Sequence, residues 1–193
     1  MRYKAINPNV EVNGQTVLSF VNALGYMKHI GLSILAEKGI ANPDPEGWYS
    51  QQKWLDAITY IAEEAGIETL YEIGSAIPEN AKFPTEINDI HKALSLIDIA
   101  YHMNHRLNKK VLFNDETKKT EEGIGNYHYN FINNKKAEII CDNPYPCDFD
   151  RGIIHSMAKK FKPSESVFVK IEHDKTKSCR ENGDKTCSYI VSW

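Results

Sequence analysis

The spacing of apolar residues along the chain changes from a helical period to a strand period. Up to about residue 106 the apolar positions recur with a period of about 3.6, as on one face of a helix. From Val111 onward they alternate with polar positions, which is typical of strands with one buried face. We therefore expect an α+β fold, in which an N-terminal layer of four helices (about 14–106) packs on a C-terminal antiparallel sheet (about 110–193). One helix should interrupt that sheet.

The helical part is divided by glycines and a proline. Gly39 and Gly66 follow the last apolar positions of two helical patterns and are suitable C-terminal caps. Pro78 should end a third helix, because proline cannot donate the backbone hydrogen bond that continues a helix. The four predicted helices cover residues 16–38, 50–65, 67–77 and 85–106.

The second part of the pattern predicts short strands around one helix. Apolar and polar residues alternate over 127–131, 137–141, 167–173 and 187–193, with turn signals between them. A helical pattern begins at Pro146 and stops at Pro163.

Two glycines and three aromatic residues point to a binding pocket between the helices and the sheet. Gly25 and Gly31 lie inside the predicted helix 16–38, where each costs about 1 kcal/mol relative to alanine. Such a cost suggests close approach by a ligand or by another backbone. Tyr127, Tyr129 and Phe131 share one face of a predicted strand. We expect a pocket lined by this strand and by the first, second and fourth helices.

Composition limits the possible classes of protein. A chain of 193 residues with 41% hydrophobic and 25% charged residues is large enough for one core, so we expect a single ligand-binding domain over 1–193. A net charge of −3 gives no basis for a nucleic-acid partner. The sequence has neither a signal-peptide core nor an apolar run of about 20 residues that could span a membrane. These features predict a cytoplasmic protein with reduced cysteines.

Three of the four cysteines are candidates for a zinc site. Cys179 and Cys187 bracket a turn signal around Gly183, so the chain could leave one sulfur and return to the other. Cys147, at the start of the predicted helix, could supply a third sulfur. Zinc in structural sites takes four tetrahedral ligands, commonly cysteine and histidine. The other interpretation is that these are buried reduced thiols of the core.

The cysteine pattern resembles that of the 4-vinyl reductase domain and the related sensor domains of phenol- and xylene-responsive activators. The resemblance rests on Cys147 followed by Gly152, and on the C-x3-G-x3-C spacing of Cys179, Gly183 and Cys187. It implies that three cysteines and a glutamate bind zinc beside a pocket for an aromatic ligand. This chain has Thr176 at the position of that glutamate.

The fourth zinc ligand must then come from a neighbouring residue. Glu172, His173 and Asp174 are the candidates within reach in the sequence. Strand alternation places His173 on the face of the apolar residues, whereas Glu172 lies on the opposite face. A neutral imidazole adds no further negative charge to three thiolates. We therefore predict His173.

The order of elements also resembles the wider ligand-binding fold of nitric-oxide signalling and Golgi-transport proteins, which includes the heme nitric-oxide/oxygen-binding domains. In heme members of that superfamily a histidine on the fourth helix binds the iron, and His91 has a similar setting in this sequence. A Tyr-x-Ser-x-Arg clamp holds their propionates. The corresponding positions here are Tyr127, Tyr129 and Phe131, so the serine and the arginine are missing. His91 is also a candidate for the ligand pocket.

These observations predict a small-molecule-binding sensor module with a structural zinc near its C-terminus. Its ligand would be small and apolar or aromatic, and its signal would pass to a separate partner protein or to a second copy of the chain. One alternative is a heme-based gas sensor of the same fold with His91 as axial ligand. Another is a small enzyme that acts on an aromatic or tetrapyrrole substrate.

Overall fold

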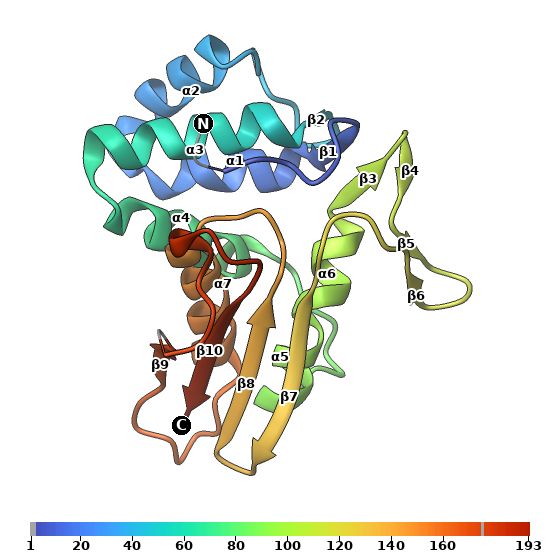
Figure 1. The fold of residues 1–193 in the computed structure, drawn as a ribbon, viewed down its shortest axis with the longest axis vertical. Coiled ribbons are helices and arrows are strands. Elements are labelled where there is room, and N and C mark those ends of the chain that lie inside the picture. The colour runs from blue at the N-terminus through green and yellow to red at the C-terminus, as the bar shows by residue number, and fades with distance from the viewer. Residues whose placement is uncertain (1–2, 175) are drawn as a thin grey trace.

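The computed structural model describes residues 3–174 and 176–193, which form helices and antiparallel sheets (Figure 1). The helices are α1 (Gly14–Ala23), α2 (Lys28–Glu37), α3 (Gln51–Ala65), α4 (Glu68–Asn80), α5 (Ile90–Ser95), α6 (Ile97–Met103) and α7 (Cys147–Phe161). Short 3-10 turns span Gly25–Met27 (η1) and Arg180–Asn182 (η2). The mixed helical and antiparallel class agrees with the α+β prediction.

The strands form one large sheet and two smaller ones. The large sheet has the order β7-β8-β10-β9, with β7 (Tyr127–Asn133), β8 (Lys136–Cys141), β10 (Cys187–Ser192) and β9 (Lys170–His173). A second sheet has the order β2-β1-β3-β4, with β1 (Val10–Asn13), β2 (Trp48–Ser50), β3 (His105–Leu107) and β4 (Lys110–Val111). The last is a ribbon of β5 (Phe113–Asn114) and β6 (Lys119–Thr120). Strands β3 to β6 form a wing that projects to one side in Figure 1.

The helices form two groups around the large sheet. Helices α1, α2 and α3 form a group at one end of the molecule, and α4 lies beneath them against α7 (Figure 1). Helix α7 contacts β9 and β10, and α5 and α6 contact β7, so these three helices cover the large sheet. The core is continuous through both groups, from Val17 and Trp54 to Ile139 and Tyr189.

Several predicted helix boundaries were wrong. The predicted helix 16–38 is two helices, because the chain turns at Gly25, whose φ of 51° lies in the left-handed region that glycine adopts readily. Pro78 lies inside α4, which continues to Asn80; the lost hydrogen bond falls in the last turn of that helix. The predicted helix 85–106 begins only after Asp89, whose side chain caps α5, and it breaks at Leu96.

Helices α4 and α7 pack with their backbones in contact. A Cβ atom at Gly152 would lie 2.2 Å from the carbonyl oxygen of Tyr71, and one at Gly74 would lie 2.1 Å from that of Phe149. Only glycine at both positions permits this approach. The crossing fixes the position of α7, and with it the first residue of that helix, Cys147. No helix in the described parts of the chain is long and apolar enough to cross a membrane.

Candidate metal centre and ligand cavity

The structure brings four potential metal ligands to one place at the end of the large sheet. Cys147 begins α7, His173 ends β9, Cys179 precedes η2 and Cys187 begins β10. One potential ligand atom from each residue lies within 4.8 Å of the other three. These are the four residues that the sequence selected, and all three cysteines are free thiols.

The distances between the sulfur atoms are close to those of a tetrahedral zinc site. The Cys179 sulfur lies 4.0 Å from both the Cys147 and the Cys187 sulfur, and the last two are 3.1 Å apart. A tetrahedron with Zn–S bonds of about 2.3 Å has sulfur atoms about 3.8 Å apart. Two of the three edges therefore fit, and the third would lengthen by roughly 0.7 Å. Cysteine sulfur and histidine nitrogen, the two ligand types of this cluster, are both ones that Zn²⁺ prefers.

His173 has a nitrogen that is available to a metal. Its ring stacks on Tyr189, with 4.8 Å between ring centroids, and its Nε2 is buried without a hydrogen-bond partner among the described residues. A buried polar atom without a partner is costly, and a metal ion would remove that cost. Glu172 instead pairs with Lys170 at 2.8 Å on the exposed side of β9. Asp174 is bonded to the Thr176 side chain.

Hydrogen bonds to the Cys187 sulfur stabilise its thiolate form. The contact with the Cys147 thiol lowers the pKa of Cys187 to about 3, and Arg180 acts in the same direction. The same contact raises the pKa of Cys147. The Arg180 backbone N–H and Nε both donate to the Cys187 sulfur, over 3.3 and 3.4 Å. A thiolate is the form of cysteine that binds a metal.

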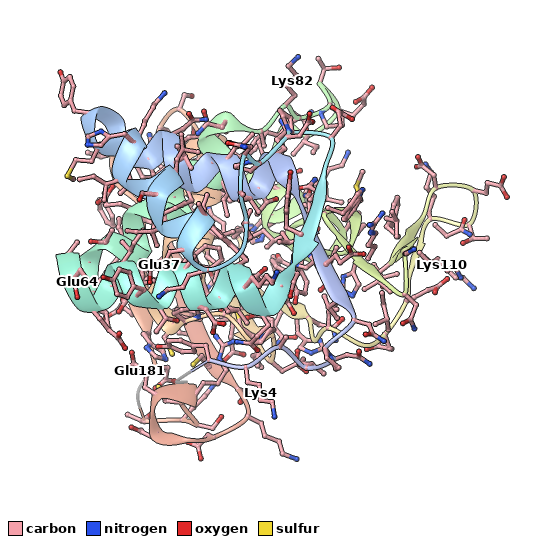
Figure 2. The ribbon with its side chains drawn as sticks, turned by 90° about the horizontal axis from the view of Figure 1, so that it is seen from above. Lys4, Glu37, Glu64, Lys82, Lys110 and Glu181 are labelled. Atoms are coloured by element: carbon pink, nitrogen blue, oxygen red, sulfur yellow. The ribbon has the colours of Figure 1, made fainter. Side chains whose placement is uncertain are left out.

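A surface depression of about 610 Å³ opens beside the metal centre. Cys147 and His173 lie in its wall together with Arg151 and Glu181. Glu181 lies on the side of the molecule remote from the β3–β6 wing, which Lys110 marks (Figure 2). The depression offers a solvent route by which a metal or a chelator could reach the centre.

A separate cavity of about 100 Å³ lies between α4, α6 and α7. Its apolar lining comes mainly from Ile77, Pro78, Phe83, Ile97, Phe149, Ile153 and Met157. Tyr101, Tyr127, Tyr145 and His105 complete one side of the wall. The volume is smaller than the few hundred Å³ that is usual for a small-molecule site. Helices α4 and α7 contribute to the lining in place of the predicted second helix.

The polar side chains of this wall are engaged with the protein. Tyr101 donates to the Ile124 carbonyl (2.7 Å) and Tyr127 donates to Asp150 (2.6 Å). His105 Nδ1 lies 2.7 Å from the Tyr101 carbonyl, so it carries the proton, and Nε2 accepts from Tyr145 (2.8 Å). Burial lowers the pKa of His105 to about 4, which keeps the ring neutral. The cavity therefore presents a mostly apolar surface.

The predicted pocket residues lie in different places. Tyr127 lines the cavity, whereas the described lining does not include Gly25, Gly31, Tyr129 or Phe131. Gly25 has open space where a Cβ would be, and Gly31 packs against the Leu24 side chain. Tyr129 is half-buried, and Phe131, farther along β7, is exposed.

His91 lies outside the lining of this cavity, at the start of α5. Its Nδ1 is 2.6 Å from the Tyr129 hydroxyl. Its ring packs against Phe131 and Trp193, with ring centroids 4.9 and 4.8 Å away. The Nε2 atom is buried without a partner among the described residues.

The sequence did not reveal Arg180, Asp150 and Tyr145 as parts of these sites. Asp150 follows Cys147 by one helical turn, which places it on the same side of α7. That spacing was the available signal for Asp150. Arg180 and Tyr145 lie in connecting segments without a periodic pattern, so only the folded chain places them.

No family model and no curated protein matches this sequence. Solved structures that resemble its fold are H-NOX proteins. An H-NOX protein from S. oneidensis, in the Fe(II)NO ligation state, superposes with a TM-score of 0.65 at 13% identity, over 93% of this chain and 98% of that chain. An oxygen-binding H-NOX domain related to soluble guanylate cyclases gives a TM-score of 0.64 at 13% identity, over 93% and 94%. A mutant of T. tengcongensis H-NOX gives 0.63 at 13% identity, over 93% and 96%.

The chain therefore has the fold of the heme nitric-oxide/oxygen-binding domains. Identity this low establishes the fold alone. The narrower resemblance to 4-vinyl reductase domains is not confirmed, because no family model matches. This is the fold expected for the heme-sensor alternative.

The residues of this chain do not fit a heme in the cavity. The cavity of about 100 Å³ is well below the range of about 300–1,000 Å³ that is usual for larger ligands. His105 is the histidine of the described lining, and both of its nitrogens are engaged. The described lining contains no arginine or lysine that could pair with a propionate.

Proposed function

We propose that residues 1–193 form one sensor domain that binds a small apolar molecule in the cavity between α4, α6 and α7. The observation that carries this proposal is an apolar space in which the wall's tyrosine hydroxyls and His105 already have partners. An engineered apolar cavity of about 150 Å³ in another protein binds benzene or xenon. A space of about 100 Å³ suits ligands of that size or smaller, including dissolved gases.

A structural zinc ion is the second part of the proposal. Cys147, Cys179, Cys187 and His173 would hold it, joining α7, β9 and β10. Four protein ligands leave no open position, so the ion would stabilise the fold without performing chemistry. The signal would pass from the domain to a separate protein, or to a second copy of the chain, by a shift between conformations. We also keep a cytoplasmic location as a prediction from the sequence.

The experiment combines metal analysis with ligand binding. Protein purified without added zinc or chelator should contain about one zinc per chain. Xenon or benzene should raise its melting temperature, and the rise should follow the logarithm of the ligand concentration once this exceeds the Kd. Filling the cavity by Ala100→Phe should abolish the effect of benzene, since Ala100 lies in the wall. Zinc below a tenth of an equivalent, or no effect of either ligand on the unmodified protein, would contradict the proposal.

A heme-based gas sensor is the second candidate, and the fold supports it. Its axial ligand would be His91, whose Nε2 is buried and unpartnered among the described residues. An absorption spectrum distinguishes the candidates after incubation with hemin and removal of the unbound hemin by gel filtration. A Soret band that is lost in His91→Ala would favour heme, and the absence of a Soret band would favour the apolar ligand. The enzyme alternative has no residues assigned to it.

A further inference from the structure

Arg180 contacts the metal centre with one part of its side chain. It begins η2, directly after Cys179, and its side chain is only 9% exposed. The backbone N–H and Nε of Arg180 donate to the Cys187 sulfur over 3.3 and 3.4 Å. Arg180 is therefore linked to two of the four proposed metal ligands: Cys179 is its neighbour in the chain, and Cys187 is its hydrogen-bond partner.

The guanidinium group of Arg180 reaches the helix that borders the cavity. Nη2 is paired with the carboxylate of Asp150, which is fully buried on α7. Nη1 donates to the Asn143 side-chain oxygen over 2.8 Å and also to the Asn143 carbonyl. A buried carboxylate requires such partners, because an unpaired charge inside a protein is strongly unfavourable.

Asp150 continues the connection to the wall of the cavity. One of its carboxylate oxygens accepts a hydrogen bond from Tyr127 over 2.6 Å. Tyr127 lines the cavity and packs edge-on against Tyr101, which also lines it, with 5.4 Å between ring centroids. A continuous set of contacts thus leads from Cys187 through Arg180 and Asp150 to Tyr127.

The position of Arg180 depends on the segment between the two cysteines. Asp184 accepts the Cys179 backbone N–H over 2.9 Å, and η2 closes at Gly183. A metal held by Cys179 and Cys187 would fix both ends of this segment. Once the metal is removed, these ends are no longer tied, and Arg180 can leave Asp150.

We propose that Arg180 is a positioning residue that couples metal occupancy to the ligand cavity. This inference rests on the proposed function, since it requires both a bound metal and a bound apolar ligand. With the metal present, Arg180 holds Asp150, and Asp150 holds the Tyr127 hydroxyl in the cavity wall. Without the metal, Tyr127 loses this support and the cavity binds its ligand more weakly.

The test measures benzene affinity of the full chain with zinc bound and after chelation. For the unmodified protein we expect zinc to tighten benzene binding by about five-fold or more, the usual lower range of coupling between sites. The informative variant is the double substitution Arg180→Gln with Asp150→Asn, which leaves no unpaired buried charge and keeps amide groups that can hydrogen-bond to each other. This variant should bind zinc about 10- to 100-fold more weakly. Its affinity for benzene should be the same at saturating zinc as after chelation.

The matched control is Lys159→Gln on the same helix. Lys159 is an exposed cation near the end of α7 and lines neither the cavity nor the depression beside the candidate metal centre, so its loss should leave the effect of zinc on benzene binding unchanged. An equal effect of zinc in the double variant and the unmodified protein would overturn the role of Arg180. If the unmodified protein binds no zinc, or binds neither benzene nor xenon in either state, the proposed function itself fails and this inference fails with it.

Discussion

At the scale of single residues, His173 distinguishes the proposed zinc site from a cluster of three reduced thiols. Its Nε2 is buried beside the three sulfur atoms and has no partner among the described residues, whereas the neighbouring Glu172 points to solvent and pairs with Lys170. The same strand thus offers a test residue and a control residue that differ mainly in the face they occupy.

We predict that His173→Ala loses most of its zinc and melts at a lower temperature, because three thiolates alone hold the ion less well. For a chain of this size each 1 kcal/mol lost lowers the melting temperature by about 2–4 °C. Glu172→Ala should keep both the zinc and the melting temperature. Metal analysis and thermal unfolding of the two variants provide the measurement, and full zinc retention by His173→Ala would remove it from the ligand set.

His105 gives a prediction about pH. Its folded pKa of about 4 lies below the unfolded value of 6.5, so the unfolded chain binds the extra proton as pH falls below 6.5. Stability should decrease from pH 6.5 toward pH 4 by about 3 kcal/mol from this residue. In His105→Gln, which can still accept from Tyr145, this part of the decrease should be absent. Urea unfolding at several pH values measures it, and equal pH profiles for the two proteins would contradict the assignment.

At the scale of elements, the crossing of α4 and α7 is the most restrictive contact. Gly152→Ala would place a Cβ 2.2 Å from a backbone oxygen, so the helices must separate. We predict a loss of about 1–3 kcal/mol, typical of overpacking, together with weaker zinc binding because Cys147 moves with α7. Gly31→Ala is the control. Its Cβ would lie 2.6 Å from the movable end of the Leu24 side chain and in ordinary contact with the Phe20 ring, so the variant should be neutral or stabilising by up to about 1 kcal/mol. Equal stability of the two variants would show that the crossing tolerates a methyl group.

The sequence predicted some elements well and others poorly, for physical reasons. Helix α3 and helix α7 were found because Ser50, Gly66 and Pro163 mark their ends by local chemistry. The break at Gly25 was missed, because an interior glycine is equally compatible with a helix and with a turn. Strands β1, β2 and β3 are too short to show a period of two, and they exist through pairing between distant segments.

The two sites differ in how far the sequence could predict them. The three cysteines could be proposed as ligands from the sequence because metal binding constrains residue type and spacing, and strand alternation then selected His173. The structure brings the four residues together, and their role as ligands stays a prediction. The cavity has no such constraint. Its wall combines α4, α6, α7 and the segment containing Tyr145, which meet only through tertiary packing. Side chains such as Phe149 and Met157 read as ordinary core residues in the sequence.

At the scale of the whole molecule, the chain has the fold of the heme nitric-oxide/oxygen-binding domains, but the lining of its cavity does not suit a heme. The tyrosine hydroxyls and His105 of the wall already have partners within the protein, and the described wall provides no cationic group. The likeness in fold therefore does not identify the ligand. One fold can hold unrelated sites, so the ligand has to be argued from the residues of this cavity.

The proposed zinc ion joins parts of the chain that are distant in sequence, so its removal should loosen one region of the molecule more than the rest. Chelation should increase amide hydrogen exchange in β9, in η2 and at the start of β10, where the ligands lie, because local opening no longer breaks metal bonds. Helices α1 and α3 pack around Phe20 and Trp54, far from the ligands in sequence, and should keep their protection. Hydrogen exchange read by mass spectrometry, with and without chelator, measures the pattern.

Cys141→Ser is a useful control, since Cys141 is buried beside Cys187 but is not one of the four clustered ligands. The variant should show the same response to chelator as the unmodified protein. A uniform increase over α1, α3 and β10 would instead show that the metal stabilises the whole domain as one cooperative unit.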